Sequence, residues 1–407
     1  MTTVPDFIPL SIFSFIAYLF DSFICAITYF FWEINTETVC DHTNNNNNNN
    51  YDSDYDYNTV YGYSCRCMFE IFLQSIDTKY KNFLITPYHH TSWRNLIEKY
   101  IPKENITILD VENFNQVNNL PHMSKCDYII TTHMFGQDIK FDYTALQKFK
   151  TQHNCILVED RVQGGTLNLK FSNPLFDIAF YSMGMDKKPV AMGGAFININ
   201  KRIDYLKTII INKLNKLPQE DSLTRFIFLV KKIPTFIIYN FKFVTWLLIK
   251  LIMFFNIDIH NFAQGYRKNN PGFSHDDYLY RPSNSLSFSI SVEKNNYIWI
   301  EKLYTKQSNC FFDSLSTNNK LKYFPWYNNA PLLSPYNTIC ILNNQDIFLD
   351  KMKKNLIIAI KNPTYKTFNF EYKNKSYYDT LNNSLIYLPS LALLSSNEIK
   401  NLVELIK

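Results

Sequence analysis

The sequence predicts an α/β protein with a three-layer large domain built on a mostly parallel sheet and a smaller α+β C-terminal domain. A hydrophobic helix is expected ahead of both. Short apolar runs alternate with helical stretches at intervals of roughly 20 to 27 residues, which is typical of a sheet covered on both faces. Of the 407 residues, 46% are apolar, so the chain can bury a large core and is not disordered throughout.

The first element is the segment from Phe7 to Trp32, within residues 1–40. It is apolar and aromatic over about 26 residues, whereas a helix needs roughly 20 to span a bilayer. Because it has no basic start and no small-residue cleavage site, we expect a retained membrane anchor or an interfacial helix rather than a removed signal peptide. A helix in the core or at a dimer contact is the alternative. The expected location is the cytoplasm or the cytoplasmic face of a membrane.

Residues 41–60 form the second element, which we expect to be a disordered linker. An uninterrupted asparagine run from Asn44 to Asn50 precedes an acidic, tyrosine-rich stretch. Such polar tracts bury too little apolar surface to offset the entropy lost on ordering. The folded part is therefore expected to begin near Tyr61.

Residues 61–230 are expected to form the large domain. Its helical stretches are Cys67–Tyr80, Ser92–Tyr100 and Tyr143–His153. In parallel sheets, ligands bind beyond the carboxyl ends of the strands, so the chemistry should lie in the loops that follow them. Six runs of four or five residues are the candidate strands: Phe83–Thr86, Thr107–Asp110, Tyr128–Thr131, Cys155–Glu159, Ile178–Tyr181 and Ala195–Ile199.

Residues 231–270 are expected to form an amphipathic helical insertion around the apolar run Ile233–Phe255. Its basic face would lie opposite Phe, Ile, Leu and Trp side chains, so a membrane interface or the N-terminal segment could cover the apolar face. A helix packed on the protein itself, with its lysines in solvent, is the alternative. Four lysines share about a third of the helix circumference: Lys231, Lys232, Lys242 and Lys250.

Residues 271–407 are expected to form the small C-terminal domain. A long helical stretch follows Pro282, strands are expected at Thr338–Leu342 and Leu356–Ile360, and the chain ends in a helix over Asn397–Ile406.

Charge and cysteine content exclude some classes of function. The 41 basic and 36 acidic residues give a formal charge of +5 without a dense Lys/Arg stripe, which argues against nucleic-acid binding as the primary function. The eight cysteines are scattered and show no metal-ligand spacing, so we expect reduced thiols and no metal site.

Two strand ends carry residues suited to chemistry. Asp160 and Gln163 follow the fourth candidate strand; taken alone, an aspartate at this place is more often a helix cap. Ser182 and Lys187 follow the fifth strand and precede a glycine pair at residues 193 and 194. A lysine in a tight loop at a strand end, beside glycines that let the backbone approach closely, suits a covalently bound aldehyde cofactor.

In order and spacing, these residues resemble the DegT/DnrJ-type sugar aminotransferases, pyridoxal-phosphate enzymes of the aspartate-aminotransferase fold (fold type I). His133–Gln137 followed by Ile156–Gln163 is similar to the family's H-x-x-G-Q and I-E-D-x-x-Q block. Phe180–Ser182 with Lys187 and the glycine pair is similar to its lysine block. The resemblance extends from about Tyr61 to Lys407 and includes two further segments, Tyr280–Asn284 at the opening of the small domain and Leu388–Ser390 before the last helix.

The resemblance implies a role for each matching residue. Lys187 would bind the cofactor covalently and move a proton between cofactor and substrate carbons, and Asp160 would keep the pyridine nitrogen protonated. Gln163 would lie against the cofactor ring or its hydroxyl, and His90 would stack on the ring. The phosphate would be held by Ser182 and by backbone amides at a helix start, at Ser64, Cys65 and Arg66.

The sequence departs from the family pattern near both cofactor loops. Cys65 stands where the family usually has glycine, which restricts the backbone beside the phosphate. The loop between Lys187 and Gly193 is shorter than is common, and Lys188 remains an alternative to Lys187. The asparagine that many members place two residues before the small-domain arginine is here Leu279.

The resemblance therefore implies a homodimeric aminotransferase that moves an amino group from an amino acid donor, glutamate in the family, to a keto sugar carried on a nucleotide. The retained lysine favours amino transfer over elimination or dehydration, because dehydratases of the family commonly replace it with histidine. The alternative is a membrane-associated protein that keeps the fold for binding or scaffolding. The sequence identifies neither the sugar nor the donor.

Overall fold

The computed structural model describes residues 57–406 except 113, 118, 164–171, 185, 186, 188–191, 241–246, 249, 253, 256, 258–277, 297, 325–338, 356, 358, 363, 364, 389, 390, 392 and 393. The expected N-terminal helix, the asparagine run and Lys188 lie outside the described residues. Within them, no helix combines the length and the apolar character needed to cross a bilayer.

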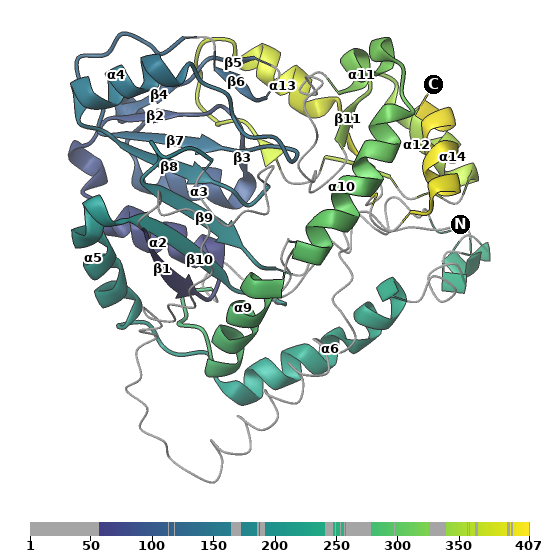
Figure 1. Ribbon diagram of the computed structural model, residues 1–407, viewed down its shortest axis with the longest axis horizontal. Helices are drawn as coiled ribbons and strands as arrows, with labels where there is room; N and C mark the ends of the chain where they lie inside the picture. The colour runs from purple at the N-terminus through teal and green to yellow at the C-terminus, as the bar shows by residue number, and fades with distance from the viewer. Residues whose placement is uncertain are drawn as a thin grey trace.

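A seven-stranded sheet forms the centre of the large domain (Figure 1). Five neighbouring strands are parallel, and two antiparallel strands complete one edge. All six predicted strands are present, so the expected α/β class with a mostly parallel sheet is confirmed. The order across the sheet is β1 (Tyr57–Gly62), β10 (Ala195–Asn200), β9 (Ile178–Ser182), β8 (Ile156–Asp160), β7 (Tyr128–Thr132), β2 (Phe83–Ile85) and β4 (Ile106–Ile108).

Alternation along the strands divides the core between the two faces of the sheet. Ile130, Val158 and Phe180 point into one apolar cluster, whereas Ile129 and Leu157 point into another. Helices α2 (Cys65–Ser75), α3 (Thr91–Tyr100) and α5 (Asp204–Leu214) contribute to the first cluster. Helices α4 (Tyr143–His153) and α9 (Asn284–Asn296) contribute to the second. Helix, sheet and helix thus form the three expected layers.

Strand β1 begins within the segment that the sequence assigns to the linker. Tyr57 pairs with Asn200 and Gly62 with Ala195, so the strand covers the outer edge of β10. The Thr59 hydroxyl donates a hydrogen bond of 2.9 Å to the Asn198 side chain. The ordered part of the chain therefore starts at least four residues before Tyr61.

Helix α6 (Ser222–Asn240) also begins earlier than the predicted insertion. Asp221 accepts a hydrogen bond of 2.8 Å from the backbone N–H of Thr224, so a side-chain cap marks the start of the helix. Residues 247, 248, 250–252 and 254 are helical again. In Figure 1, α6 runs along the lower right of the molecule.

The C-terminal part has a separate three-stranded antiparallel sheet of β11 (Ile339–Ile341), β14 (Leu385–Tyr387) and β12 (Ile360–Lys361). The same part of the chain contains helices α10 (Ile298–Asp313), α11 (Thr317–Tyr323), α12 (Gln345–Lys354), α13 (Lys375–Asn383) and α14 (Ser396–Ile406). A large apolar cluster belongs mainly to this part, but it also takes in Met134 and Phe135 of the large domain. Strand β13 (Tyr365–Lys366) pairs with β3 (His89–His90) and joins the two parts. Strand β14 was not predicted.

Candidate active site

The two halves of the first motif block hydrogen-bond to each other at the ends of β7 and β8. The backbone N–H of His133 donates to the Asp160 carbonyl at 3.0 Å, and the N–H of Gly136 donates to the Gln163 carbonyl at 2.9 Å. Gly136 has a φ of 75°, a conformation that suits glycine, in the turn closed by Gln137 N–H to Met134 O. The separate motifs therefore form one loop pair at the carboxyl edge of the sheet.

Asp160 is the last residue of β8, and its carboxyl is almost completely buried. Burial raises the pKa of Asp160 to about 6, while the Val162 N–H and the charges of His133 and Lys187 act in the opposite direction. The Val162 N–H donates to the carboxylate at 3.0 Å. Lys187 is half-buried and close enough for its charge to act on Asp160. The lysine and the carboxylate that the sequence selects therefore lie in one place.

Glu159 points to the other face of the sheet and enters a separate polar network. The Nδ1 atom of His133 accepts from the Ile139 N–H at 3.0 Å, and its Nε2 atom lies 2.9 Å from Glu159 Oε2. Arg161 lies 3.4 Å from the same oxygen, and the Ser172 N–H and hydroxyl also donate to this carboxylate. Both His133 and Glu159 are fully buried. The network holds the end of β8, and with it Asp160, against the neighbouring loop.

The start of α2 meets the end of β9 through Gly194. The Gly194 N–H donates to the Tyr63 carbonyl at 3.1 Å, and the Met183 N–H donates to the Gly194 carbonyl at 3.0 Å. Ser64 precedes the helix, and its hydroxyl accepts from the Cys67 N–H at 3.1 Å. This contact brings Ser182, the last residue of β9, to the corner where α2 begins. The predicted helix start at residues 64–66 is thus present.

Cys65 connects the helix start to the lysine and the carboxylate. Burial and the Asp160 charge raise the pKa of the Cys65 thiol, and a hydrogen bond with the Trp93 side chain and the charge of Lys187 oppose them. Cys65 is 7% exposed. Arg66 points elsewhere, because its guanidinium lies over the Tyr278 ring at 5.0 Å. Of the three residues, Cys65 therefore has its side chain at the site.

The two consecutive histidines point in different directions. His89 is completely buried and hydrogen-bonds through Nδ1 to the Thr132 hydroxyl at 2.7 Å, and Thr132 pairs with Asp160 in the sheet. Burial lowers the pKa of His89 to about 3. His90 is half-buried, caps α3 through its Nδ1 atom and lies edge-on to Tyr365 at 5.9 Å. The sequence selects His90 as the stacking residue, but the structure brings His89 to the strand ends.

Gln163 is 4% exposed, and its Oε1 atom is buried without a hydrogen-bond partner among the described residues. A buried amide oxygen of this kind can accept a hydrogen bond from a bound molecule.

Sequence reasoning missed Trp93 and His89, because their roles depend on contacts with Cys65 and Thr132 that no spacing reveals.

The glycine pair at the end of the lysine loop is required by close contacts. A Cβ atom on Gly194, which has a φ of 84°, would lie 2.5 Å from Ile290 Cδ1. A Cβ atom on Gly193 would lie 3.1 Å from the Arg225 guanidinium, which is buried at the start of α6. The start of α6 therefore packs directly against the loop that carries Lys187.

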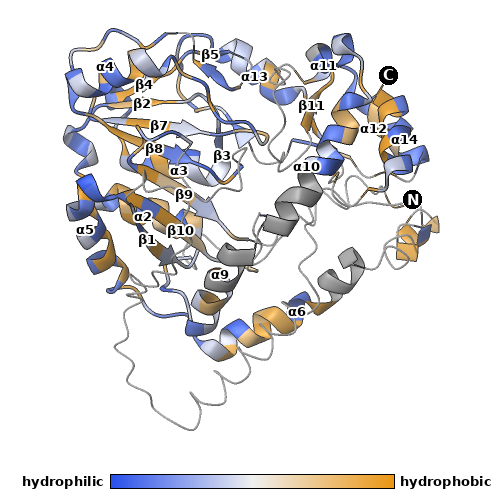
Figure 2. Cartoon of the chain, viewed as in Figure 1, coloured by the Kyte–Doolittle hydropathy of each residue, from blue (hydrophilic) through white to orange (hydrophobic). Residues whose placement is uncertain are grey.

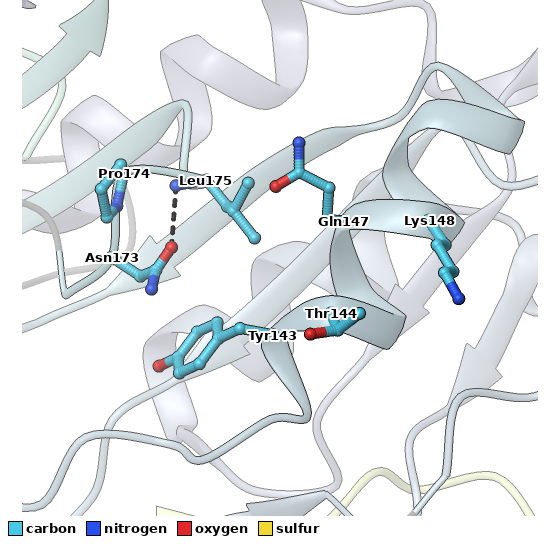
Figure 3. A pocket seen from close by; sticks show the side chains of 7 residues that line it. All are labelled: Tyr143, Thr144, Gln147, Lys148, Asn173, Pro174 and Leu175. Atoms are coloured by element: carbon cyan, nitrogen blue, oxygen red, sulfur yellow. Dashed lines mark hydrogen bonds between the residues drawn. The ribbon is translucent and has the colours of Figure 1, made fainter.

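A separate open pocket of about 500 Å³ lies between α4 and residues 173–175 (Figure 3). Asn173 accepts a hydrogen bond of 3.0 Å from the Leu175 N–H at its rim. Tyr143, Gln147 and Lys148 line the helix side. The pocket shares no residue with the site above. We found no group of three or more His, Cys, Asp or Glu side chains suited to a metal ion within the described ranges.

Comparison with known proteins establishes the fold. No protein-family model matches the sequence, and no curated protein matches it. Solved structures do match, and the class they represent is the sugar aminotransferase fold that the motifs predict. At 11 to 13% identity, these likenesses show the architecture.

Three of these structures illustrate the class. Spr1654 of Streptococcus pneumoniae, assigned as a sugar aminotransferase and solved in its PMP form, has a TM-score of 0.63 and 13% identity over 100% of this chain and 96% of its own. PseC of Helicobacter pylori, an aminotransferase of pseudaminic acid biosynthesis, has a TM-score of 0.62 and 11% identity over 100% and 98%. The Escherichia coli GDP-4-keto-6-deoxy-D-mannose-3-dehydratase, with bound hydrated PLP, has a TM-score of 0.58 and 13% identity over 86% and 87%.

Proposed function

We propose that this protein is a pyridoxal-phosphate-dependent aminotransferase that acts on a keto sugar. The observation that carries the proposal is the meeting of Lys187 and the buried Asp160 carboxyl at the carboxyl ends of β8 and β9, beside the start of α2. The second, weaker support is that structures of the same fold are named as sugar aminotransferases and a sugar dehydratase.

The residues present fit pyridoxal phosphate. The buried Asp160 carboxyl, whose pKa burial raises to about 6, would gain a cationic partner in a protonated pyridine nitrogen. The unpartnered Oε1 of Gln163 would gain a donor. The N-terminus of α2 offers backbone N–H groups to a phosphate. The buried Cys65 side chain takes up space where the phosphate would bind, because most family members have glycine at this position.

Each residue then has a defined task. The cofactor supplies an electron sink that stabilises negative charge on the carbon that carries the amino group. Asp160 holds a proton at the pyridine nitrogen, and Lys187 holds the cofactor and moves a proton with its amine Nζ. Ser182 and the start of α2 bind the phosphate. His133, Glu159 and Arg161 keep the end of β8 in place.

The finer parts of the proposal concern substrates and assembly. The acceptor is a keto sugar linked to a nucleotide, the donor is an amino acid such as glutamate, and the active form is a homodimer. The name of the Escherichia coli dehydratase, which specifies a GDP-linked keto sugar, supports the first part. The donor and the dimer rest on the motif resemblance.

An absorbance spectrum of the purified full chain tests the proposal. With added pyridoxal phosphate, we expect a visible band from the lysine-bound cofactor that shifts when glutamate is added. Lys187→Ala should abolish the band, and Lys188→Ala, the matched neighbour, should leave it. A band that persists in Lys187→Ala and disappears in Lys188→Ala would reassign the lysine.

The alternative is a protein that keeps this fold for binding only, and the buried Cys65 side chain in the phosphate corner favours it. Cys65→Gly separates the two functions. A band that appears only in this variant would show a site closed by one side chain. The absence of a band in both proteins at saturating cofactor would refute the enzyme proposal and leave the binding function.

A further inference from the structure

Exposed apolar side chains concentrate in one part of this molecule. Of the fourteen large hydrophobic residues that are exposed in the described part of the chain, eight fall between residues 223 and 257. Isolated exposed apolar residues are ordinary, but a cluster usually marks a surface that binds something.

Helix α6 presents an apolar stripe to solvent. Leu223, Ile227 and Val230 are spaced by four and three residues, so they share one face, and they are 50%, 42% and 39% exposed. Arg225 and Leu229 lie on the opposite face and are buried. The helix therefore packs on the protein with one side and shows an apolar side outward. Figure 2 shows its hydrophobic colouring along the lower edge of the molecule.

The helical residues that follow repeat this arrangement. Ile252 is buried in the C-terminal core, whereas Leu247 and Leu251 are 43% and 47% exposed. Phe254 and Phe255 are 78% and 67% exposed, with ring centroids 5.3 Å apart. Two adjacent phenylalanines at this level of exposure would bury a large apolar area if they entered a bilayer.

Basic residues outnumber acidic ones beside these residues, where Asp221 and Asp258 stand just outside the two ends. Residues 222–257 contain five basic residues and no acidic residue. Of these, Lys231 and Lys250 are exposed next to the two apolar stripes. A surface that combines exposed Leu and Phe with lysines is complementary to a membrane interface with anionic headgroups. A symmetric contact between two copies would instead place one basic surface against another.

We propose that one surface of the described residues binds an anionic lipid bilayer. We call it the apolar-basic surface, and it consists of Leu223, Ile227, Val230, Lys231, Leu247, Lys250, Leu251, Phe254 and Phe255. The phenylalanines and leucines enter the headgroup region, and the lysines contact anionic lipid. This proposal does not depend on the aminotransferase proposal, because none of these side chains belongs to the site at Lys187. Arg225 connects the apolar-basic surface with the lysine loop, because it lies in α6 and its guanidinium packs beside Gly193.

Hydrogen–deuterium exchange of the full chain, with and without vesicles, tests the proposal at the level of peptides. Vesicles of phosphatidylcholine with about a third phosphatidylserine should protect peptides within residues 222–257, and pure phosphatidylcholine should protect them much less. Peptides from residues 1–40 report separately on the N-terminal segment. The double variant Phe254→Ser/Phe255→Ser should lose the protection in its own region.

Charge reversal provides the second arm. One lysine near an anionic surface contributes about 1 kcal/mol, so Lys231→Glu and Lys250→Glu should each lower vesicle binding at least about fivefold. Two exposed residues outside the surface serve as matched controls: Ile347→Ser on α12, which is 70% exposed in the parent, and Lys400→Glu on α14. Both controls should bind vesicles as the parent does.

Three results would overturn the proposal. Vesicles that protect residues 1–40 and leave 222–257 unprotected would assign lipid contact to the N-terminal segment alone. Protection of 222–257 that rises with protein concentration without lipid would assign the surface to a second copy. Protection without lipid that disappears when residues 1–40 are deleted would assign it to the chain's own N-terminal segment.

Discussion

Replacing Asp160 with asparagine should stabilise the cofactor-free protein at neutral and alkaline pH. Burial raises the pKa of this carboxyl from 3.8 to about 6. A carboxyl with a raised pKa holds its proton more tightly in the folded protein than in the unfolded chain. Its contribution to stability is therefore full below pH 4 and is lost as the pH rises through about 6.

The size of the effect follows from the pKa shift. Raising the pKa from 3.8 to about 6, at about 1.4 kcal/mol for each tenfold change in proton affinity, gives about 3 kcal/mol of destabilisation above pH 7. Asparagine carries no charge to bury and keeps an oxygen that can accept from the Val162 N–H, which now donates to Asp160 at 3.0 Å. The variant should therefore recover most of this energy.

Urea unfolding of the cofactor-free chain at pH 4 and pH 8 measures the effect. We expect the free energy of unfolding of Asp160→Asn to exceed that of the parent by about 3 kcal/mol at pH 8 and to equal it at pH 4. Asp177→Asn is the control, because Asp177 is equally buried but bonds to Lys150 at 2.6 Å and to Arg202, and should lose stability. A destabilised Asp160→Asn protein at pH 8 would refute the reasoning, since it would mean that the charge is already compensated.

Three further changes test the site. Burial lowers the pKa of His89 to about 3, so protonation favours the unfolded chain below pH 6.5; about 2 kcal/mol of stability should be lost between pH 6.5 and 5, and His89→Gln should remove this slope in urea titrations. Gly194→Ala should cost about 1 to 3 kcal/mol, because its Cβ would collide with Ile290, and the costs of Gly194→Ala and Ile290→Ala should be less than additive in urea unfolding of the double variant. Glu159→Gln removes one of the two carboxylates beside the buried Arg161, whereas Asp138 stays at 3.2 Å, and should cost about 1.5 to 3 kcal/mol. A cost below about 0.5 kcal/mol, measured by urea unfolding, would show that the network does not hold β8.

The sequence predicts the central sheet because each of its interior strands can be recognised from its own residues. Strands buried on both faces appear as short apolar runs, and the rule that ligands bind at the carboxyl ends of parallel strands directed attention to Asp160 and Lys187. The register of β8 and β9 explains why the residues predicted at two separate strand ends lie at one site. Asp160 pairs with Phe180, so Asp160 and Ser182 point to the same face.

Other features could not be predicted from the same patterns. Strand β1 is mostly half-buried and directly follows a polar tract, so its sequence lacks the apolar run of an interior strand. Helix α6 has apolar residues on its buried side and on its exposed side, which hides the helical period of the sequence and the residue where the helix starts. Asp221 was the available signal, since its side chain caps the helix. Trp93 and His89 act through contacts with distant residues, which only the folded chain reveals.

The position of β1 also constrains the order in which the chain can complete its sheet during synthesis. Thr59 and its partner Asn198 are 139 residues apart. At roughly 5 to 20 residues per second, the first strand waits about 7 to 28 s before its partner has been translated. During that interval, the ribosome exposes the N-terminal segment and β1 while the edge that will receive β1 does not yet exist. Any partner that residues 1–40 bind during this interval is therefore bound before the sheet of the large domain is complete.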